Sequence, residues 1–420
     1  MKVVPQSLLC LWLVFWVGPS WANDSAKYSE YIKALEDVNN DNLKKLIIGE
    51  LTEYVYKFQD SDDIDKMHFK IATIYHDDGD EVKSFFENIQ ILYLYPESEF
   101  VQVSKDRLRS ILMQDKKFKS ISSSTDKLLN PVILDSTREA RHFAFLQDMH
   151  DLRFKPIRSL LLQAYNLFLS HFASYEKADA VLFWRAELLD ADNETYDALA
   201  DYLKLTYLHR SSLYVSASQL KLAHIFTEKL KDHERAITTL NNFLLEFPED
   251  PQAAQAQMQI AKIYQKQRKQ YLEAIDEYKK VAEKYPNSLE AVPALFEAAH
   301  LYRDKFDEYD KAIKVYTRIV QDFPKDLKAP YAFVEAARIY EKKLKDFGNA
   351  ASVYFKVYGN YPESVIAAQS LFAAAELNEQ KVGDVDRAKT YYRFVVDKYP
   401  KNKLAEKAAK RLEKLSRNNQ

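Results

Sequence analysis

Histidine is the side chain in this sequence best suited to binding a metal or moving a proton, and the chain has nine of them. No His-Glu-x-x-His motif occurs, and no two histidines stand four residues apart, where one helix face would bring both rings to a metal. His224 and His300 share one position of the repeat described below, but the other copies have Glu187, Lys262, Arg338 and Glu376 there. Such a variable position predicts surface residues, so we expect no metal site among the histidines.

Two acidic turns, at residues 60–65 and 76–81, are further candidates for a cation site. The first contains the run Asp-Ser-Asp-Asp, and the second combines one histidine with three aspartates and a glutamate. Carboxylate oxygens suit a hard cation such as calcium, but neither segment has the EF-hand pattern. Because both segments lie at predicted turns, helix capping is the expected role of these carboxylates, and cation binding is the alternative.

Nucleophilic and phosphate-binding chemistry also lack a local motif. No serine lies in a Gly-x-Ser-x-Gly elbow, and the only cysteine, Cys10, falls in a segment that we expect to be removed. The six glycines among 420 residues form no Gly-x-Gly-x-x-Gly or Walker loop. Since nucleotide folds and tight β-turns need glycine, we predict a largely helical, non-catalytic protein without a cofactor.

Charge is nearly balanced, with 60 basic and 62 acidic residues, and therefore does not indicate nucleic acid or an anionic membrane as a partner. The balance shifts at the carboxyl end, where residues 398–420 contain eight Lys or Arg and two Glu. A solvated helix face explains such a run, and a dedicated anionic partner is the alternative.

The amino-terminal segment, residues 1–22, has the pattern of a secretory signal peptide. Lys2 precedes an apolar run from Ser7 to Val17, and Ser20-Trp21-Ala22 is a small-x-small cleavage site. The apolar run is well short of the roughly 20 residues that span a membrane. We expect cleavage after Ala22, which would give an exported protein without cysteine or a transmembrane segment. The periplasm is the expected location, and secretion is the alternative.

A sequence repeat with a period of about 38 residues organises the rest of the chain. Three sets of residues keep this step. An aromatic-Pro pair recurs at Phe247-Pro248, Tyr285-Pro286, Phe323-Pro324, Tyr361-Pro362 and Tyr399-Pro400. One alanine column comprises Ala223, Ala261, Ala299, Ala337 and Ala375, and the other comprises Ala198, Ala236, Ala274, Ala312, Ala350 and Ala388. Three independent columns that keep one period predict a stack of similar structural units.

Each unit reads as an antiparallel helix pair. The aromatic-Pro pair ends a helix, because proline disfavours the helical conformation of the residue before it. Two residues after each proline stands a residue typical of helix amino termini, namely Asp250, Ser288, Asp326, Ser364 or Asn402, and we expect the first helix to begin there. The second helix of one unit begins near Lys311. The alanines of the two helices are small residues at which the helices can pack closely, and such a pair must stack on neighbours to bury its apolar face.

These residues resemble the tetratricopeptide repeat. The order of Ala299, Tyr302, Ala312, Tyr316 and Pro324 within one unit is that of the family. The usual unit has about 34 residues, and this chain has one more in the turn within a pair and three more between pairs. The resemblance implies an all-α superhelix, or solenoid, of about seven or eight helix hairpins.

The aromatic-Pro variant is similar to the repeats of bacterial envelope proteins, notably the outer-membrane assembly lipoprotein BamD and the periplasmic Tol-Pal-associated protein CpoB. The sequence departs from the first because it has no lipidation motif around Cys10, and from the second because no amino-terminal coiled coil is evident. The resemblance implies a role in the cell envelope.

The weaker upstream pattern completes the predicted layout. Residues 1–22 are the signal peptide, and residues 23–115 are a divergent repeat region in which Phe58 and Ala72 keep the spacing of the regular units. Residues 116–156 break the period and are expected to form an irregular linker or hinge. The main array runs from 157 to 415, and 416–420 form a tail.

A surface on the first helices is the predicted binding site. Three residues before each alanine stands an apolar residue, in the order Phe183, Leu220, Met258, Phe296, Val334 and Phe372. The family resemblance places this column in the concave groove, whereas packing between repeats would place it in the core; both interpretations stay open. With charged residues beside it, the groove would suit an extended or helical peptide. The predicted contact residues are Phe296, His300, Arg303, Val334, Arg338 and Phe372.

We therefore predict a periplasmic scaffold or adaptor that binds other proteins through its concave face, in envelope assembly or division. One alternative is a scaffold of a polysaccharide-export or outer-membrane assembly machine that contacts glycan or membrane. Trp184 is the only tryptophan after the signal segment, so sugar stacking has weak support. An enzyme is the remaining, least favoured alternative. The sequence names neither the partner nor the oligomeric state.

Overall fold

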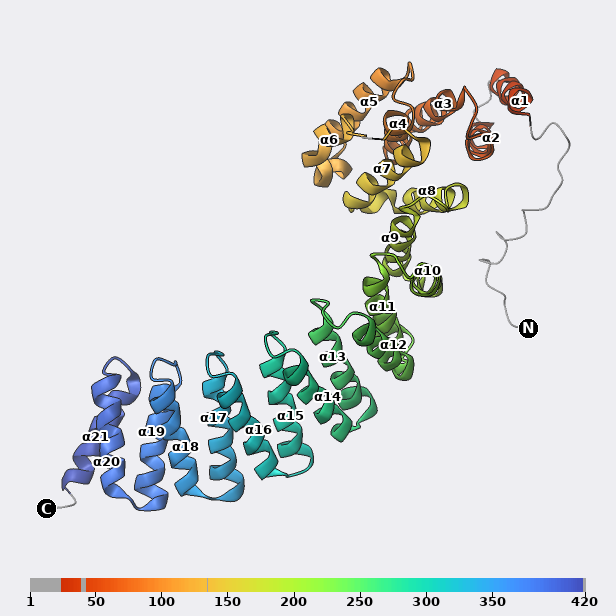
Figure 1. Cartoon of the computed structure of the whole chain (residues 1–420). Coiled ribbons are helices and arrows are strands. Elements are labelled where there is room, and N and C mark those ends of the chain that lie inside the picture. Colours follow the sequence, from red (N-terminus) through yellow and green to blue (C-terminus); the bar gives the residue numbers. More distant parts are fainter. Residues whose placement is uncertain (1–23, 39–42, 134, 418–420) are drawn as a thin grey trace, which may run out of the picture. The chain divides into compact units, whose positions relative to one another are not determined.

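The structure is a computed structural model that describes residues 24–38, 43–133 and 135–417. The predicted signal segment, with Cys10 and Ala22, lies outside the described residues. The chain divides into two compact units, unit 1 up to Val215 and unit 2 from Ser216 onward. Throughout the described ranges the regular elements are helices (Figure 1). The predicted all-α repeat architecture is confirmed, although the boundary between the units falls inside the array predicted for 157–415.

Unit 2 consists of five helix pairs followed by α21 (Lys403–Arg417). The first helices of the pairs are α11 (Val215–His224), α13 (Ala253–Lys262), α15 (Ala291–Lys305), α17 (Ala329–Arg338) and α19 (Ala367–Leu377). Four of them continue into a π-helical turn: η6 (Ile225–Lys229), η7 (Ile263–Arg268), η8 (Ile339–Leu344) and η9 (Asn378–Val382). The second helices are α12 (His233–Glu246), α14 (Tyr271–Lys284), α16 (Tyr309–Asp322), α18 (Phe347–Asn360) and α20 (Val385–Lys398). From α12 onward each helix packs on the next along the chain, so the pairs form a continuous stack.

The two alanine columns lie where first and second helices meet. Ala299 and Ala312 are fully buried, as are their equivalents Ala261, Ala274, Ala337, Ala350, Ala375 and Ala388. One turn after the second-helix alanine, Tyr278, Tyr316, Tyr354 and Tyr392 are buried in the same core. Each second helix ends just before the aromatic residue of the aromatic-Pro pair, whose amide donates to the carbonyl four residues earlier. These helix ends are as the sequence predicts.

The first helices end differently, in a left-handed residue. Lys231, Lys269, Asp307, Lys345 and Gly383 have φ angles of 56°, 59°, 50°, 56° and 83°, and they recur with the period of the repeat. After the first four of them, the next amide donates to a carbonyl six residues earlier, for example from Asp346 to Tyr340 at 2.9 Å. In unit 1 the equivalent bonds span five residues, from Asp80 to Tyr75 and from Glu194 to Leu189. The extra residue predicted for the turn is therefore accommodated by widening the end of the first helix.

The helix caps lie on the second helices rather than the first. The carboxylates of Asp232, Asp346 and Asp384 each accept the amide three residues later, at 3.0, 3.0 and 2.9 Å. The expectation that first helices begin at the residues from Asp250 to Asn402 is wrong for four of the five, because α13, α15, α17 and α19 begin three residues later. Asp250 and Asp326 instead accept the amide two residues on, which closes a turn before the helix.

Unit 1 contains less regular repeats. Its helices are α1 (Ser25–Asp37), α2 (Lys44–Lys57), α3 (Ile64–Asp77), α4 (Glu81–Leu94), α5 (Val101–Gln114), α6 (Thr125–Leu129), α7 (Arg138–Asp151), α8 (Arg158–His171), α9 (Ala178–Ala191) and α10 (Thr195–Leu208), with short helices η4 (Lys116–Ser124) and η5 (Lys155–Ile157). The helices α1 and α2, α3 and α4, α7 and α8, and α9 and α10 pack as consecutive pairs.

The expectation of an irregular linker or hinge at residues 116–156 is not met. Most of this segment is helical, and it packs into the core of unit 1. Phe118 is fully buried against Phe85 and Phe154, and Phe145 of α7 contacts Phe86 of α4. A segment that buries this many aromatic rings cannot move independently of its neighbours.

The left-handed lysines of unit 2 give a prediction about stability. An L-residue pays a steric cost in this conformation that glycine does not. We expect Lys345→Gly and Lys269→Gly each to raise the free energy of unfolding by about 0.5 kcal/mol, after allowance for the greater freedom of glycine in the unfolded chain.

The matched control is Lys342→Gly, inside η8, where glycine should lower the free energy of unfolding by about 1 kcal/mol. Urea unfolding followed by circular dichroism measures both effects. Equal destabilisation by all three substitutions would show that the left-handed turn does not form in solution.

Candidate functional site

The predicted contact residues lie on three successive first helices of unit 2. Phe296, His300 and Arg303 are on α15, Val334 and Arg338 on α17, and Phe372 on α19. Arg338 is exposed. The other predicted residues of α15 and α17 are partly buried, namely Phe296, His300, Arg303 and Val334. The side chain of Phe372 is almost covered, with 8% exposed. We call the outward side of α11, α13, α15, α17, α19 and α21 the first-helix surface.

The apolar column forms the floor of the first-helix surface. The ring of Phe296 packs on Tyr316 of α16 with centroids 5.7 Å apart, and Phe372 packs edge-on to Tyr392 of α20 at 5.5 Å. Leu220, Phe296 and Val334 remain partly exposed, whereas Met258 and Phe372 are buried. The column thus joins the core to the surface, with some members partly exposed and others buried.

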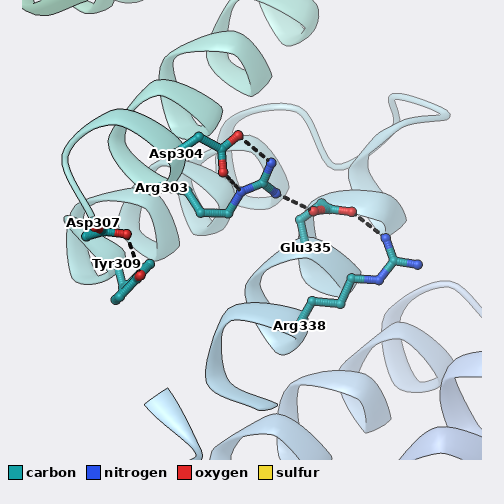
Figure 2. A network of polar contacts seen from close by, with 6 residues as sticks. All are labelled: Arg303, Asp304, Asp307, Tyr309, Glu335 and Arg338. Carbon is teal, nitrogen blue, oxygen red and sulfur yellow. Dashed lines mark hydrogen bonds and ion pairs between the residues drawn. The ribbon is translucent and has the colours of Figure 1, made fainter. Parts of the chain in front are cut away.

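Arg303 connects two neighbouring first helices (Figure 2). Its guanidinium donates two bonds to Asp304, at 2.6 and 2.9 Å, and a third to Glu335 of α17 at 2.7 Å. The other oxygen of Glu335 accepts a bond from Arg338 at 2.6 Å. The bonds with Asp304 raise the pKa of Arg303 and lower the pKa of Asp304. Of the two arginines predicted to contact a partner, Arg303 is therefore held in place, and Arg338 is the more accessible.

The same connection recurs along unit 2 with different residues. Gln265 donates to Glu297 at 3.3 Å, and Arg411 donates to Glu379 at 3.3 Å, each pair having the same sequence separation as Arg303 and Glu335. These bonds join α15 to the π turn of α13, and α21 to the π turn of α19. Equivalent polar contacts therefore connect α13 with α15, α15 with α17, and α19 with α21.

Buried tyrosines of the second helices form hydrogen bonds with the first-helix residues that are equivalent to Arg303. Tyr354 donates to Glu341 at 3.1 Å and Tyr392 donates to Glu379 at 2.7 Å. In the pair of α15 and α16, the residue at this position is Arg303, whose guanidinium can only donate hydrogen bonds. The buried hydroxyl of Tyr316 therefore has no hydrogen-bond partner. The first-helix surface around Phe296 and His300 therefore rests on the least satisfied tyrosine of this set.

A hollow of about 720 Å³ opens on the first-helix surface between α19 and α21. Its lining consists of Gln369, Phe372, Ala373 and Glu376 from α19, and Leu404, Lys407, Lys410, Arg411 and Lys414 from α21. Four basic side chains thus face one carboxylate across an apolar floor. Burial raises the pKa of Glu376, in spite of the nearby cations Arg411 and Lys407.

Sequence reasoning missed two surface features of unit 2. The basic residues of α21 that line the hollow follow the helical spacing i, i+3, i+4 and i+7, a pattern that was visible in the sequence. A second feature is a row of nearly fully exposed apolar residues in the turns between pairs, with Leu289, Leu327 and Val365 exposed by 91%, 89% and 86%. These three residues also recur with the period of the repeat and directly follow the turn residues Ser288, Asp326 and Ser364.

The acidic turns proposed as cation sites are engaged by the protein itself. In the first, Asp63 accepts hydrogen bonds from Ser29 and Ser61, and Asp60 pairs with Arg138. In the second, Asp80 caps α4 and Asp78 pairs with Lys44 at 3.3 Å. Among the described residues no group of three or more His, Asp or Glu side chains is arranged to hold a metal ion. Hydrogen bonding, ion pairing and helix capping thus engage Asp60, Asp63, Asp78 and Asp80.

Four segments of unit 2 match a known protein family. Residues 217–250, 255–288, 293–326 and 367–402 match the tetratricopeptide repeat family. Four of the five helix pairs of unit 2 therefore match tetratricopeptide repeats. The α17–α18 pair lies outside the matched segments but has the same helices, buried alanines and left-handed turn as the other repeats.

Solved structures similar to the chain include tetratricopeptide repeat proteins. A tetratricopeptide repeat protein from Parabacteroides merdae is 16% identical, with 66% of this chain and 99% of that chain covered and a TM-score of 0.35. The carboxyl-terminal part of a repeat protein from Cytophaga hutchinsonii is 18% identical, with 64% and 98% covered and a TM-score of 0.37. YrrB, described as having an unusual peptide-binding site, is 18% identical, with 50% and 97% covered and a TM-score of 0.29. No curated protein matches the chain in sequence.

The contrast between the two arginines of Figure 2 gives a prediction. Arg303 bridges two repeats and its side chain is 23% exposed, whereas Arg338 is 48% exposed and pairs only within its own helix. We expect Arg303→Met to lower the free energy of unfolding by about 1 kcal/mol, and Arg338→Met to lower it by less than about 0.5 kcal/mol.

Chemical unfolding of the two variants in low salt measures the difference. A larger loss for Arg338→Met would contradict the assignment of Arg303 as the connecting residue.

Proposed function

We propose that this protein is a non-catalytic scaffold of the bacterial periplasm that binds partner proteins through its first-helix surface, in cell-envelope assembly or division. One observation carries the proposal. Across the repeats of unit 2, an apolar floor of fixed position lies beside a column whose charge changes from copy to copy: His224, Lys262, His300, Arg338 and Glu376. A fixed floor with variable walls suits recognition of one polypeptide along several repeats.

The packing of the site favours binding over catalysis. Arg303, the strongest donor on α15, is fully engaged by Asp304 and Glu335, and the hydroxyl of Tyr316 is buried beneath the surface. The exposed charges of this surface include Lys262 and Arg338, and Arg338 is already paired with Glu335 of its own helix. Such charges contribute to the rate and selectivity of protein association.

The envelope location rests on the amino-terminal sequence and on the aromatic-Pro form of the repeats. Lys2, the short apolar run and the site at Ala22 together support export. No helix among the described residues has the length and apolar character needed to cross a membrane.

Direct contact with glycan is not favoured. Trp184, the one tryptophan beyond the signal segment, is only 7% exposed. Its ring stacks on His150 at 5.0 Å and on Phe143 at 5.3 Å, so it is part of the unit 1 core and offers no free face to a sugar. We therefore do not extend the proposal to a polysaccharide-export scaffold.

Export gives the first prediction of this proposal. When the full chain is expressed in a bacterium with an intact envelope, we expect it in the periplasmic fraction with Asn23 as its amino-terminal residue, because cleavage follows Ala22. Amino-terminal sequencing measures this. A retained Met1, or a cytoplasmic protein, would contradict the periplasmic location but not the use of the first-helix surface.

Partner binding gives the second prediction of this proposal. A photo-cross-linking amino acid is placed at Lys262 or Arg338 on the first helices, and at Lys314 or Lys356 on the second helices as matched exposed controls. We expect the first-helix positions to give a discrete cross-linked protein, and the second-helix positions to give about tenfold less of it, because the partner lies along one surface. Equal cross-linking from both sets would contradict the proposed surface.

A further inference from the structure

The hollow between α19 and α21 is formed by two facing helix stripes. On α19 the lining residues are Gln369, Phe372, Ala373 and Glu376, and on α21 they are Lys407, Lys410, Arg411 and Lys414, with Leu404 at one end. Both stripes have the spacing i, i+3, i+4 and i+7, which places all four side chains of a stripe on one side of its helix. One wall therefore combines the apolar Phe372 and Ala373 with Gln369 and Glu376, and the opposite wall is basic.

The basic wall is only partly neutralised by the protein. Lys407 and Lys414 form no ion pair within the described residues. Lys410 pairs with Glu406 at 2.9 Å, but both side chains are at least three-quarters exposed, so this pair is weak. Only Arg411, which bonds Glu379 at 3.3 Å, is partly compensated. The hollow therefore presents excess positive charge beside an apolar surface.

The apolar wall is preformed by the packing of the repeats. Phe372 is held edge-on against Tyr392, and the opposite stripe of α21, Ala405, Ala408 and Leu415, is buried. The two walls are thus fixed by the core, and little ordering is needed when a ligand enters.

We propose that this hollow binds an acidic, extended segment of a partner protein, in which carboxylate side chains alternate with an apolar one. This inference rests on the proposed function and names the chemistry of the partner. In an extended peptide, successive side chains point to opposite sides. Two carboxylates separated by one residue would face Lys407, Arg411 and Lys414, and the residue between them would face Phe372 and Ala373.

The length of the hollow along α21 agrees with a short extended peptide. Seven helical steps separate Lys407 from Lys414, which corresponds to about 10 Å along the axis. An extended chain advances about 3.3 Å per residue, so about three residues fit along the hollow. The pattern acidic–apolar–acidic therefore fills it once.

A protein segment fits better than a lipid surface or a nucleic acid. The cations line a recess whose other wall includes Phe372 and Ala373, which a continuous row of phosphates would leave uncovered. The other basic residues near the carboxyl end, Lys398, Lys401 and Lys403, lie outside the lining and do not extend the charge into a strip. A membrane or nucleic-acid site would use such a strip.

Fluorescence anisotropy of a labelled decapeptide containing two Glu-Leu-Glu segments tests the proposal on the purified protein. We expect saturable binding that weakens as salt is added. A peptide with glycine in place of leucine should bind at least roughly fivefold more weakly, since it cannot cover the apolar wall, and a Lys-Leu-Lys peptide should not bind.

Two double variants with the same change in net charge locate the site. Lys407→Glu with Lys414→Glu should raise the Kd at least roughly tenfold, whereas Lys398→Glu with Lys401→Glu should change it less than about twofold. All four lysines are exposed, so both variants should keep the wild-type circular dichroism. Equal losses in the two variants would show unspecific charge attraction and overturn the proposal.

Glu376→Gln is a variant that should strengthen peptide binding, in contrast to the lysine variants. Removing the one carboxylate of the lining should lower the Kd about two- to threefold. A higher Kd would mean that Glu376 holds the ligand through a hydrogen bond, which also contradicts an acidic occupant.

The remaining outcomes separate this inference from the proposed function. Sedimentation with phosphatidylglycerol vesicles that depends on Lys407 and Lys414, without peptide binding, would replace the acidic segment by a lipid surface. Failure of the peptide to bind while Arg338 still cross-links a partner would overturn only the hollow. Peptide binding without any first-helix cross-link would keep the hollow and overturn the wider surface.

Discussion

The close contact between the two helices of each repeat is the constraint on which the rest of unit 2 depends. It exists because an alanine lies at the crossing on both helices, and the pairs from Ala261 with Ala274 to Ala375 with Ala388 are completely buried. A larger side chain at either position would move the helices apart, since the core has no room for additional atoms. The tyrosine one turn further, such as Tyr316 or Tyr392, would then lose its place beneath the first-helix surface. Both the spacing of the first helices and the shape of the hollow follow from this contact.

The same arrangement explains how a repeated scaffold carries a site that is not repeated. Polar bonds between successive first helices occur at equivalent positions, but their chemistry changes from Gln265–Glu297 to Arg303–Glu335 and Glu379–Arg411. The geometry is thus kept while the charge of the surface varies along the stack. Because the helix spacing does not depend on one particular pair, exposed neighbours such as Arg338 are free to differ between repeats without a change in fold.

Much of unit 2 could be predicted from the sequence, because its strongest signals are local. The aromatic-Pro pair excludes a helical residue before it, and the alanines recur in all five helix pairs. The ends of the first helices could not be predicted, because lysine or aspartate occupies four of the five left-handed positions and these residues give no glycine signal. Residues 116–156 were misread for another reason: Phe118, Phe145 and Phe154 are buried by contacts within unit 1 that no repeat period records. For the site, the sequence located the apolar column but not the division of its members between surface and core.

The departures of α21 from the repeat connect the fold to the hollow. Where earlier first helices have an apolar floor residue, such as Phe372, α21 has Lys410, and where they have the buried alanine it has the exposed Glu413. α21 packs on α20 through Ala405, Ala408 and Leu415, as the earlier first helices pack on the second helix before them, and its exposed Glu413 makes no alanine contact. The positions that would be floor in another repeat are therefore released from packing. In α21 they carry the charges that face Phe372 and Ala373, which makes this helix both the cover of the apolar core and the basic wall of the binding hollow.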